Sequence, residues 1–221
     1  MNIPRTMRSC LAALLPIFSA QAQGTFQNLD FELGNPGSGS FNLSVPVADA
    51  LPDWSVNYGS VQQTDIGYNV VSLGATDVSL IGPGGPGGGP IDGNYSVLLQ
   101  GGPSSASISQ TGVIPAGTQT LLFEAESSGP LDVFIGGQDV PFSAVGSGPN
   151  FTLYGANISA WQGQPEQLTF SVLAGSAAFN SWELDDISFS TQAIPEASPL
   201  VLTGTAGLLF ALYRRFAARR H

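Results

Sequence analysis

Short segments in which apolar and polar residues alternate recur along most of the chain, and Gly, Pro, Asn and Asp separate them. Alternation with a period of two is typical of strands that bury one face of a sheet. Turn residues at intervals of about ten are typical of an all-β sandwich or jelly roll. The clearest segments are residues 54–58, 95–99, 106–110, 120–124, 131–135, 167–173 and 184–189. No window between residues 24 and 193 carries convincing helical periodicity, so the sequence predicts a single β-sandwich domain over residues 24–192.

Charge is distributed very unevenly along the chain. All six basic residues lie near the two ends: Arg5, Arg8, Arg214, Arg215, Arg219 and Arg220. Of the 16 acidic residues only Glu196 lies outside residues 24–193, so this segment holds 15 carboxylates and no Lys, Arg or His. A net charge of −15 repels phosphate groups, which excludes nucleic acid as a partner of the domain.

The residue types of the domain also restrict its chemistry. Nucleophilic triads and histidine-based acid–base catalysis need an imidazole, a thiolate or an amine, and residues 24–193 contain none. Typical zinc sites fail for the same reason. Paired carboxylates remain available, and such pairs can hydrolyse glycosides. Glu124 with Glu126, or Glu183 with Asp185, would share one face of a strand; the alternative for both pairs is a solvated polar face.

The N-terminal residues 1–22 have the order of a secretory signal peptide. Arg5 and Arg8 precede the apolar residues 11–18, and the small residues Ser-Ala-Gln-Ala follow at positions 19–22. The apolar stretch is too short to span a bilayer. We expect signal peptidase to cut after Ala22, which would also remove Cys10, the only cysteine.

The C-terminal residues 199–213 form an uncharged, largely apolar stretch that arginines follow at once. As a helix it would be about 22 Å long at 1.5 Å per residue. Arginines that extend toward the membrane surface would help this short helix to span the hydrocarbon core. The sequence therefore predicts a single transmembrane helix with residues 214–221 at its cytoplasmic end and the domain on the opposite side.

The motif Ile194-Pro195-Glu196-Ala197, the apolar helix and the terminal arginines together resemble the PEP-CTERM sorting signal of bacteria that make exopolysaccharide. Ala197 stands where that pattern has its second proline. The resemblance implies that residues 193–221 are a sorting tail, which a membrane-embedded exosortase recognises and cleaves to deliver the protein to the cell surface. It concerns sorting only.

The edges of the domain carry three short signatures: residues 26–32 (Phe-Gln-Asn-Leu-Asp-Phe-Glu), 51–54 (Leu-Pro-Asp-Trp) and 182–189 (Trp-Glu-Leu-Asp-Asp-Ile-Ser-Phe). They resemble the galactose-binding-like jelly rolls, a group that includes many carbohydrate-binding modules. In that group a structural Ca²⁺ often joins the first and last strands. The resemblance implies calcium ligands at Glu32 and Asp186, with Asp30 and Asp185 beside them; the alternative is that these acids lie at solvated strand ends.

Aromatic side chains that remain exposed beside polar groups could stack against a sugar ring. Trp161 lies in the polar segment 159–164, and Tyr58 and Tyr68 have similar Asn- and Gly-rich surroundings. These three are the candidate ligand-binding residues, and the alternative for Trp161 is a place in the core or in a structural lid. The Gly- and Pro-rich segment 82–90 contains a G-x-G-x-x-G string, but its three prolines lack an N–H group, so we expect a flexible loop and not a phosphate site.

Together these observations predict an exported, non-catalytic protein of the cell surface or extracellular matrix that associates with carbohydrate or exopolysaccharide. The alternative is a structural surface or adhesion protein without a specific small ligand. A glycan-active enzyme is a more distant alternative.

Overall fold

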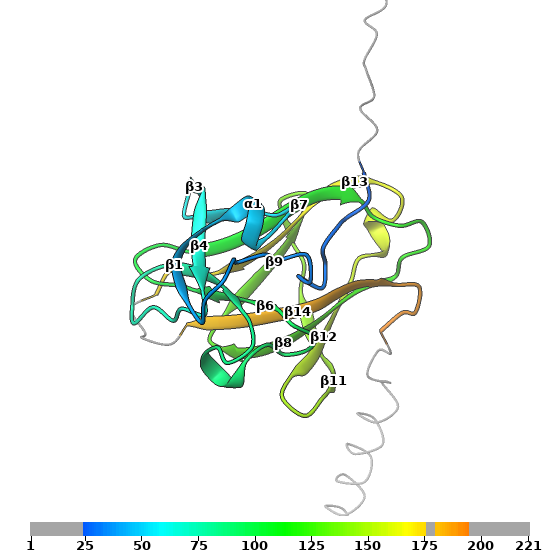
Figure 1. Cartoon of the computed structure of the whole chain (residues 1–221). Coiled ribbons are helices and arrows are strands. Elements are labelled where there is room, and N and C mark those ends of the chain that lie inside the picture. The colour runs from blue at the N-terminus through cyan, green and yellow to red at the C-terminus, as the bar shows by residue number, and fades with distance from the viewer. Residues whose placement is uncertain (1–23, 176–179, 195–221) are drawn as a thin grey trace, which may run out of the picture.

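The computed structural model, drawn in Figure 1, describes residues 24–175 and 180–194. The predicted signal peptide, Pro195 and Glu196 of the sorting motif, the predicted helix 199–213 and the terminal arginines lie outside these residues. Ile194 is described: a Cβ atom on Gly155 would come within 3.1 Å of its Cδ1 atom, so its side chain packs close to that position. Within the described ranges no helix is long and apolar enough to cross a membrane.

The described residues form two sheets, of which the larger has eight strands and is antiparallel except for one pair, β4 with β5. Across the sheet the order is β1 (Asn42–Pro46), β4 (Asp65–Tyr68), β5 (Asp77–Ile81), β6 (Ser96–Gln100), β14 (Ser181–Ser190), β8 (Thr120–Ser128), β12 (Thr152–Asn157) and β11 (Phe142–Ser147). The last strand of the described residues, β14, therefore lies in the middle of the sheet, between β6 and β8. This long-range pairing closes the domain.

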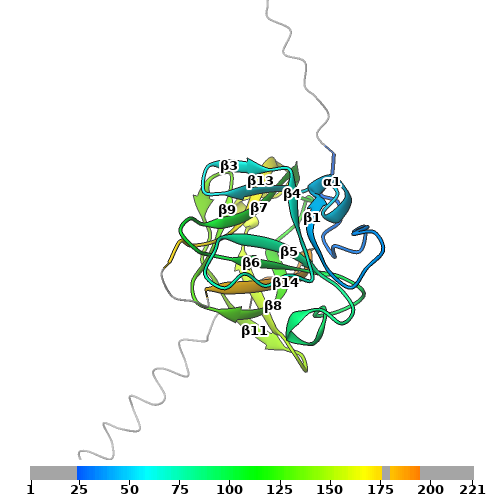
Figure 2. The same cartoon turned by 60° about the vertical axis from the view of Figure 1, so that its left-hand side comes forward.

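The smaller sheet has six strands, in the order β10 (Gln138–Asp139), β9 (Leu131–Ile135), β13 (Pro165–Val172), β7 (Ala106–Val113), β2 (Ser55–Tyr58) and β3 (Val61–Gln63). Helical structure in the described residues is limited to α1 (Val47–Ala50) and the 3₁₀ turns η1 (Pro86–Gly88) and η2 (Ser159–Trp161). Figures 1 and 2 show the two sheets packed against each other. The prediction of an all-β sandwich is confirmed, and each predicted segment overlaps a strand.

The core lies between the sheets, and it is filled by the apolar side chains that alternate with polar ones along the strands. Leu121, Phe123 and Ala125 of β8 point inward and are at most 1% exposed, whereas the residues between them are more exposed. The Phe123 ring meets Phe170 of β13 from the opposite sheet with ring centroids 5.2 Å apart in an edge-to-face arrangement. Aromatic pairs of this geometry add to the free energy gained from burying apolar area.

The outward face of the eight-stranded sheet is polar at its centre, because the alternate residues of β14 there are polar or acidic. Glu183 of β14 lies between Leu98 of β6 and Glu126 of β8, and Asp185 lies opposite Glu124 of β8. The pairing of β8 with β14 thus sets carboxylates from distant parts of the chain side by side on one outer surface.

Residues 69–76 connect β4 to β5, the one parallel pair of this sheet, in which Gly67 pairs with Ser79 and Tyr68 with Leu80. Parallel neighbours cannot be joined by a tight hairpin, so this connection has to travel back along the sheet. The side chain of Gln100 on β6 fixes it: the Ser72 N–H donates to Gln100 Oε1 at 2.7 Å, and Gln100 Nε2 donates to the Ser72 carbonyl at 3.2 Å.

Candidate functional site

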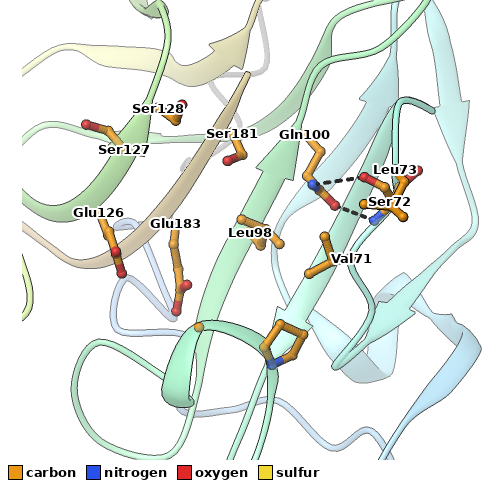
Figure 3. Close-up of a pocket in the computed structure, with 12 residues that line it drawn as sticks. Val71, Ser72, Leu73, Leu98, Gln100, Glu126, Ser127, Ser128, Ser181 and Glu183 are labelled. Carbon is orange, nitrogen blue, oxygen red and sulfur yellow. Dashed lines mark hydrogen bonds between the residues drawn. The ribbon is translucent and has the colours of Figure 1, made fainter. Parts of the chain in front are cut away.

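A pocket of about 230 Å³ opens on the outward face of the eight-stranded sheet. Its floor is formed by Leu98 and Gln100 of β6 together with Ser181 and Glu183 of β14. Glu126, Ser127 and Ser128 of β8 form one side, as Figure 3 shows. We call this the Glu126–Glu183 pocket, because its two carboxylates lie side by side on the paired strands β8 and β14.

Glu183 is a largely buried acidic group of the pocket. Its side chain is only 8% exposed, and Ser96 Oγ donates a hydrogen bond to its Oε1 atom. Burial raises the pKa of Glu183 to about 7; the Ser96 hydrogen bond opposes this shift and the charge of Glu126 adds to it. A carboxylic acid with this pKa changes its protonation state near neutral pH, and no basic residue in segment 24–193 compensates its charge.

The remaining walls come from two loops that the sheet holds in place. The 69–76 connection contributes Val71, Ser72 and Leu73, and the Gln100 hydrogen bonds visible in Figure 3 anchor it. Leu73 is 88% exposed, so the rim of the pocket presents apolar surface next to the polar floor. The Gly-rich segment supplies Pro86 and Gly87.

The Gly-rich segment forms the short turn η1 instead of leading into a helix, so it offers no helix terminus to a phosphate. The side chain of Asn69 holds its start, because the Gly82 N–H donates to Asn69 Oδ1 at 2.7 Å. Gly87 has a φ of +75°, which favours glycine, and a Cβ atom there would lie 3.9 Å from Glu183 Oε2. This turn therefore brings the backbone close to the buried carboxylate.

The candidate calcium residues gather farther along the same face. Asp185 is 1% exposed; its Oδ2 accepts from the Asp92 N–H at 3.1 Å and its Oδ1 from the Asp186 N–H at 2.8 Å. Burial raises the pKa of Asp185 to about 8 despite these hydrogen bonds, and the charges of Asp186 and Glu32 act in the same direction. Burial, followed by the charges of Asp92, Asp30 and Glu32, also raises the pKa of Asp186.

Asp186 thus lies close enough to the other three residues of the calcium prediction, and to Asp92, for their charges to repel. Oε2 of Glu124 is buried without a hydrogen-bond partner among the described residues, and the charges of Asp186 and Asp92 add to the burial that raises its pKa. Oxygen donors with uncompensated charge are the ligands that Ca²⁺ prefers. In the described residues, however, no three acidic side chains are arranged to hold a metal ion.

The three candidate aromatic residues lie on three different elements. Tyr68 of β4 is 7% exposed and belongs to the core. Tyr58 of β2 is half-buried, and its hydroxyl donates to Asp77 Oδ1 at 2.9 Å and accepts from the Val78 N–H at 3.0 Å. Trp161 closes η2 and is half-buried against the core. None of the three lines the Glu126–Glu183 pocket.

The sequence paired acids along single strands, Glu124 with Glu126 and Glu183 with Asp185, whereas the structure pairs Glu126 with Glu183 across two strands. Finding this pair requires the register between β8 and β14, which are far apart in the chain. The alternation within each segment shows which residues point outward, but it does not show which strands are neighbours.

No protein-family model matches the chain, and no curated protein matches it. Among solved structures it is similar to TmCBM61 in complex with β-1,4-galactotriose, with a TM-score of 0.43 and 15% identity over 77% of this chain and 99% of that one. It is also similar to the family 11 carbohydrate-binding module of Clostridium thermocellum in complex with a β-1,3-1,4-mixed-linked tetrasaccharide, with a TM-score of 0.34 and 12% identity over 72% of this chain and 100% of that one.

Proposed function

We propose that the protein is a non-catalytic carbohydrate-binding protein that acts outside the cell. The Glu126–Glu183 pocket carries this proposal, because it combines hydrogen-bonding side chains on its floor with apolar surface at its rim. Sugars present hydroxyl groups and apolar ring faces, and pockets that bind small ligands combine these two kinds of surface. Two carboxylates can accept hydrogen bonds from neighbouring hydroxyls, and Ser128 and Ser181 can both donate and accept.

Binding without turnover agrees with the residue types of the domain. Segment 24–193 supplies no thiol, imidazole or amine, so a reaction would have to depend on carboxylates alone. Incubation of the purified protein with a panel of polysaccharides should therefore release no reducing ends. Release that disappears in Glu183→Gln would instead make the protein a glycosidase.

Carbohydrate binding is tested by applying the purified protein to a glycan array and measuring the affinity of the strongest hit by calorimetry. Glu126→Gln should weaken binding about tenfold or more, since it removes an acceptor for charge-assisted hydrogen bonds. Asp139→Asn is the matched control, because Asp139 is exposed on β10 in the other sheet and its substitution changes the net charge equally. A protein that retains no glycan would favour the alternative, a structural surface or adhesion protein.

The route out of the cell is a second part of the proposal and rests on residues outside the described ranges. We propose that signal peptidase removes residues 1–22 and that the helix at 199–213 anchors the protein until an exosortase processes the tail. Intact-mass measurements on the membrane-bound and released protein would show both cuts. A released protein that keeps residues 193–221 would contradict processing of the tail.

We also propose Ca²⁺ as a structural ion of the acidic cluster, held through Glu32 and Asp186 with Asp30 and Asp185 beside them. The buried Glu124 Oε2 atom, which has no hydrogen-bond partner in the part of the chain that the structure describes, and the repulsion around Asp186 support this proposal. The ion would supply positive charge to a domain that has no basic side chain of its own.

A further inference from the structure

The Glu126–Glu183 pocket contains an acceptor atom that the described part of the chain leaves free. Glu183 is more than nine-tenths buried, and Ser96 binds only its Oε1 atom. Its Oε2 atom accepts no hydrogen bond from the described residues, and Glu183 is one of the side chains that line the pocket. Oε2 is not one of the buried unpartnered atoms of the described residues, so this acceptor is accessible to water and to a ligand in the pocket.

The carboxylate of Glu126 indicates which charge a ligand of this pocket should carry. Glu126 lies opposite Glu183 across the β8–β14 pair and is exposed, so the pocket holds two adjacent carboxyl groups. No Lys, Arg or His in segment 24–193 offsets the two charges. A neutral ligand can only share hydrogen bonds with this pair, an anionic ligand adds repulsion, and a cationic ligand removes the repulsion that is already present.

We propose that the Glu126–Glu183 pocket selects glycans that carry protonated amines, such as units of unacetylated glucosamine, over neutral and acidic glycans. This inference rests on the proposed carbohydrate binding and specifies its ligand class. An ammonium group on a sugar ring donates charge-assisted hydrogen bonds to the two carboxylates, while ring hydroxyls meet Ser128 of β8 and Ser181 of β14. The apolar rim at Leu73 and Pro86 is available to the ring faces.

The overall charge of the domain could also attract amines, so the experiment must separate a local effect from a diffuse one. Diffuse attraction between exposed charges falls steeply with salt, whereas a bond to a nine-tenths buried carboxylate is screened much less. Short oligosaccharides of one length, measured near physiological ionic strength, therefore report the pocket. EDTA in the buffer prevents calcium from bridging acidic ligands to the protein.

The test is calorimetry of the full chain with four tetrasaccharides: glucosamine, N-acetylglucosamine, glucose and galacturonate. We expect the glucosamine tetramer to bind about tenfold or more tightly than the neutral pair, which corresponds to about 1.4 kcal/mol, and the galacturonate tetramer to bind most weakly. Glu126→Gln and Glu183→Gln should each remove most of this preference. Asp139→Asn should leave it unchanged, and thermal melts should show that all three variants are folded.

The outcomes distinguish this inference from the function on which it rests. Equal binding of the glucosamine and glucose tetramers would overturn the inference and leave carbohydrate binding intact. A preference for the amine that persists in the double variant Glu126→Gln/Glu183→Gln would place its origin outside the pocket and also overturn the inference. Failure of all four tetramers and of the glycan array would overturn carbohydrate binding itself.

Discussion

The carboxylate of Glu32 accepts hydrogen bonds from both the backbone N–H and the side-chain amide of Asn94, at 2.6 and 2.8 Å. The Tyr95 N–H adds a third hydrogen bond at 3.0 Å. One side chain from the opening segment therefore organises the turn that leads into β6. Gly93 in this turn has a φ of +57°, and a Cβ atom there would collide with the Glu32 carboxylate.

We expect Glu32→Ala to destabilise the domain by about 2 kcal/mol, since hydrogen bonds to a charged group contribute about 1.5–3 kcal/mol. Burial tends to raise the pKa of Glu32, but the hydrogen bonds from Asn94 and Tyr95 outweigh it, so its pKa is lowered. Urea unfolding near neutral pH measures the loss. Asp30→Asn, measured like Glu32→Ala in EDTA, serves as the control, because within the described residues Asp30 accepts a single long hydrogen bond, at 3.4 Å. Equal effects of both substitutions would contradict this role for Glu32.

The stability of the domain should fall as the pH rises from about 5 to 8 in the absence of calcium. Burial raises the pKa of Glu183 to about 7 and that of Asp185 to about 8, so the folded protein retains protons that the unfolded chain has already lost. Stability decreases with pH wherever the folded state binds more protons. We expect a loss on the order of 3 kcal/mol in urea titrations.

Glu183→Gln should reduce this pH dependence but not abolish it, because the amide carries no charge that burial can penalise and the contribution of Asp185 remains. Asp139→Asn should leave it unchanged, since Asp139 is exposed on the opposite sheet. A stability that rises with pH over the same range would show that these two acids are not the groups that dominate the titration.

Removal of calcium should lower the melting temperature of the purified protein by several degrees at pH 7.5. An ion that binds only the folded state stabilises it by mass action, and EDTA abolishes that contribution. Asp186→Asn should melt at the temperature of the EDTA-treated protein and no longer respond to EDTA. An unchanged melt, together with no calcium in elemental analysis, would remove calcium from the description of this domain.

Phe123→Ala should destabilise the domain by about 3–5 kcal/mol, because it leaves a cavity in the layer between the sheets. Phe123 is fully buried and contacts Phe170, Phe142 and Tyr154 with centroid distances of 5.2, 5.4 and 5.4 Å. Phe123→Leu should cost clearly less, since it preserves most of the volume. Equal losses for the two variants would contradict the account of the packing given above.

Trp161→Ala distinguishes a structural role for this side chain from a role in ligand binding. Trp161 is half-buried against the core, so we expect a lower melting temperature and unchanged retention on a polysaccharide gel. Lost retention with an unchanged melt would make Trp161 a sugar platform after all.

The period of two allowed the strands to be predicted well, because each core strand has to present apolar side chains on one face. The segment 131–135, for example, coincides with β9. The pocket could not be predicted in this way, since Glu126 and Glu183 meet only through the register of two strands that are distant in sequence. The anchoring of Ser72 by Gln100 is equally non-local, and neither residue belongs to a motif.

The parallel direction of β4 and β5 determines that a loop lies over the outward face of the sheet beside the pocket. Had these neighbours run in opposite directions, a two-residue hairpin could have joined them and the surface above β6 would have been bare. Because the two strands are parallel, residues 69–76 have to form a long connection back along the sheet, and the hydrogen bonds of Gln100 to Ser72 hold this connection against β6. Shortening the 69–76 connection should therefore change which ligands bind in the Glu126–Glu183 pocket, with little effect on the stability of the eight-stranded sheet.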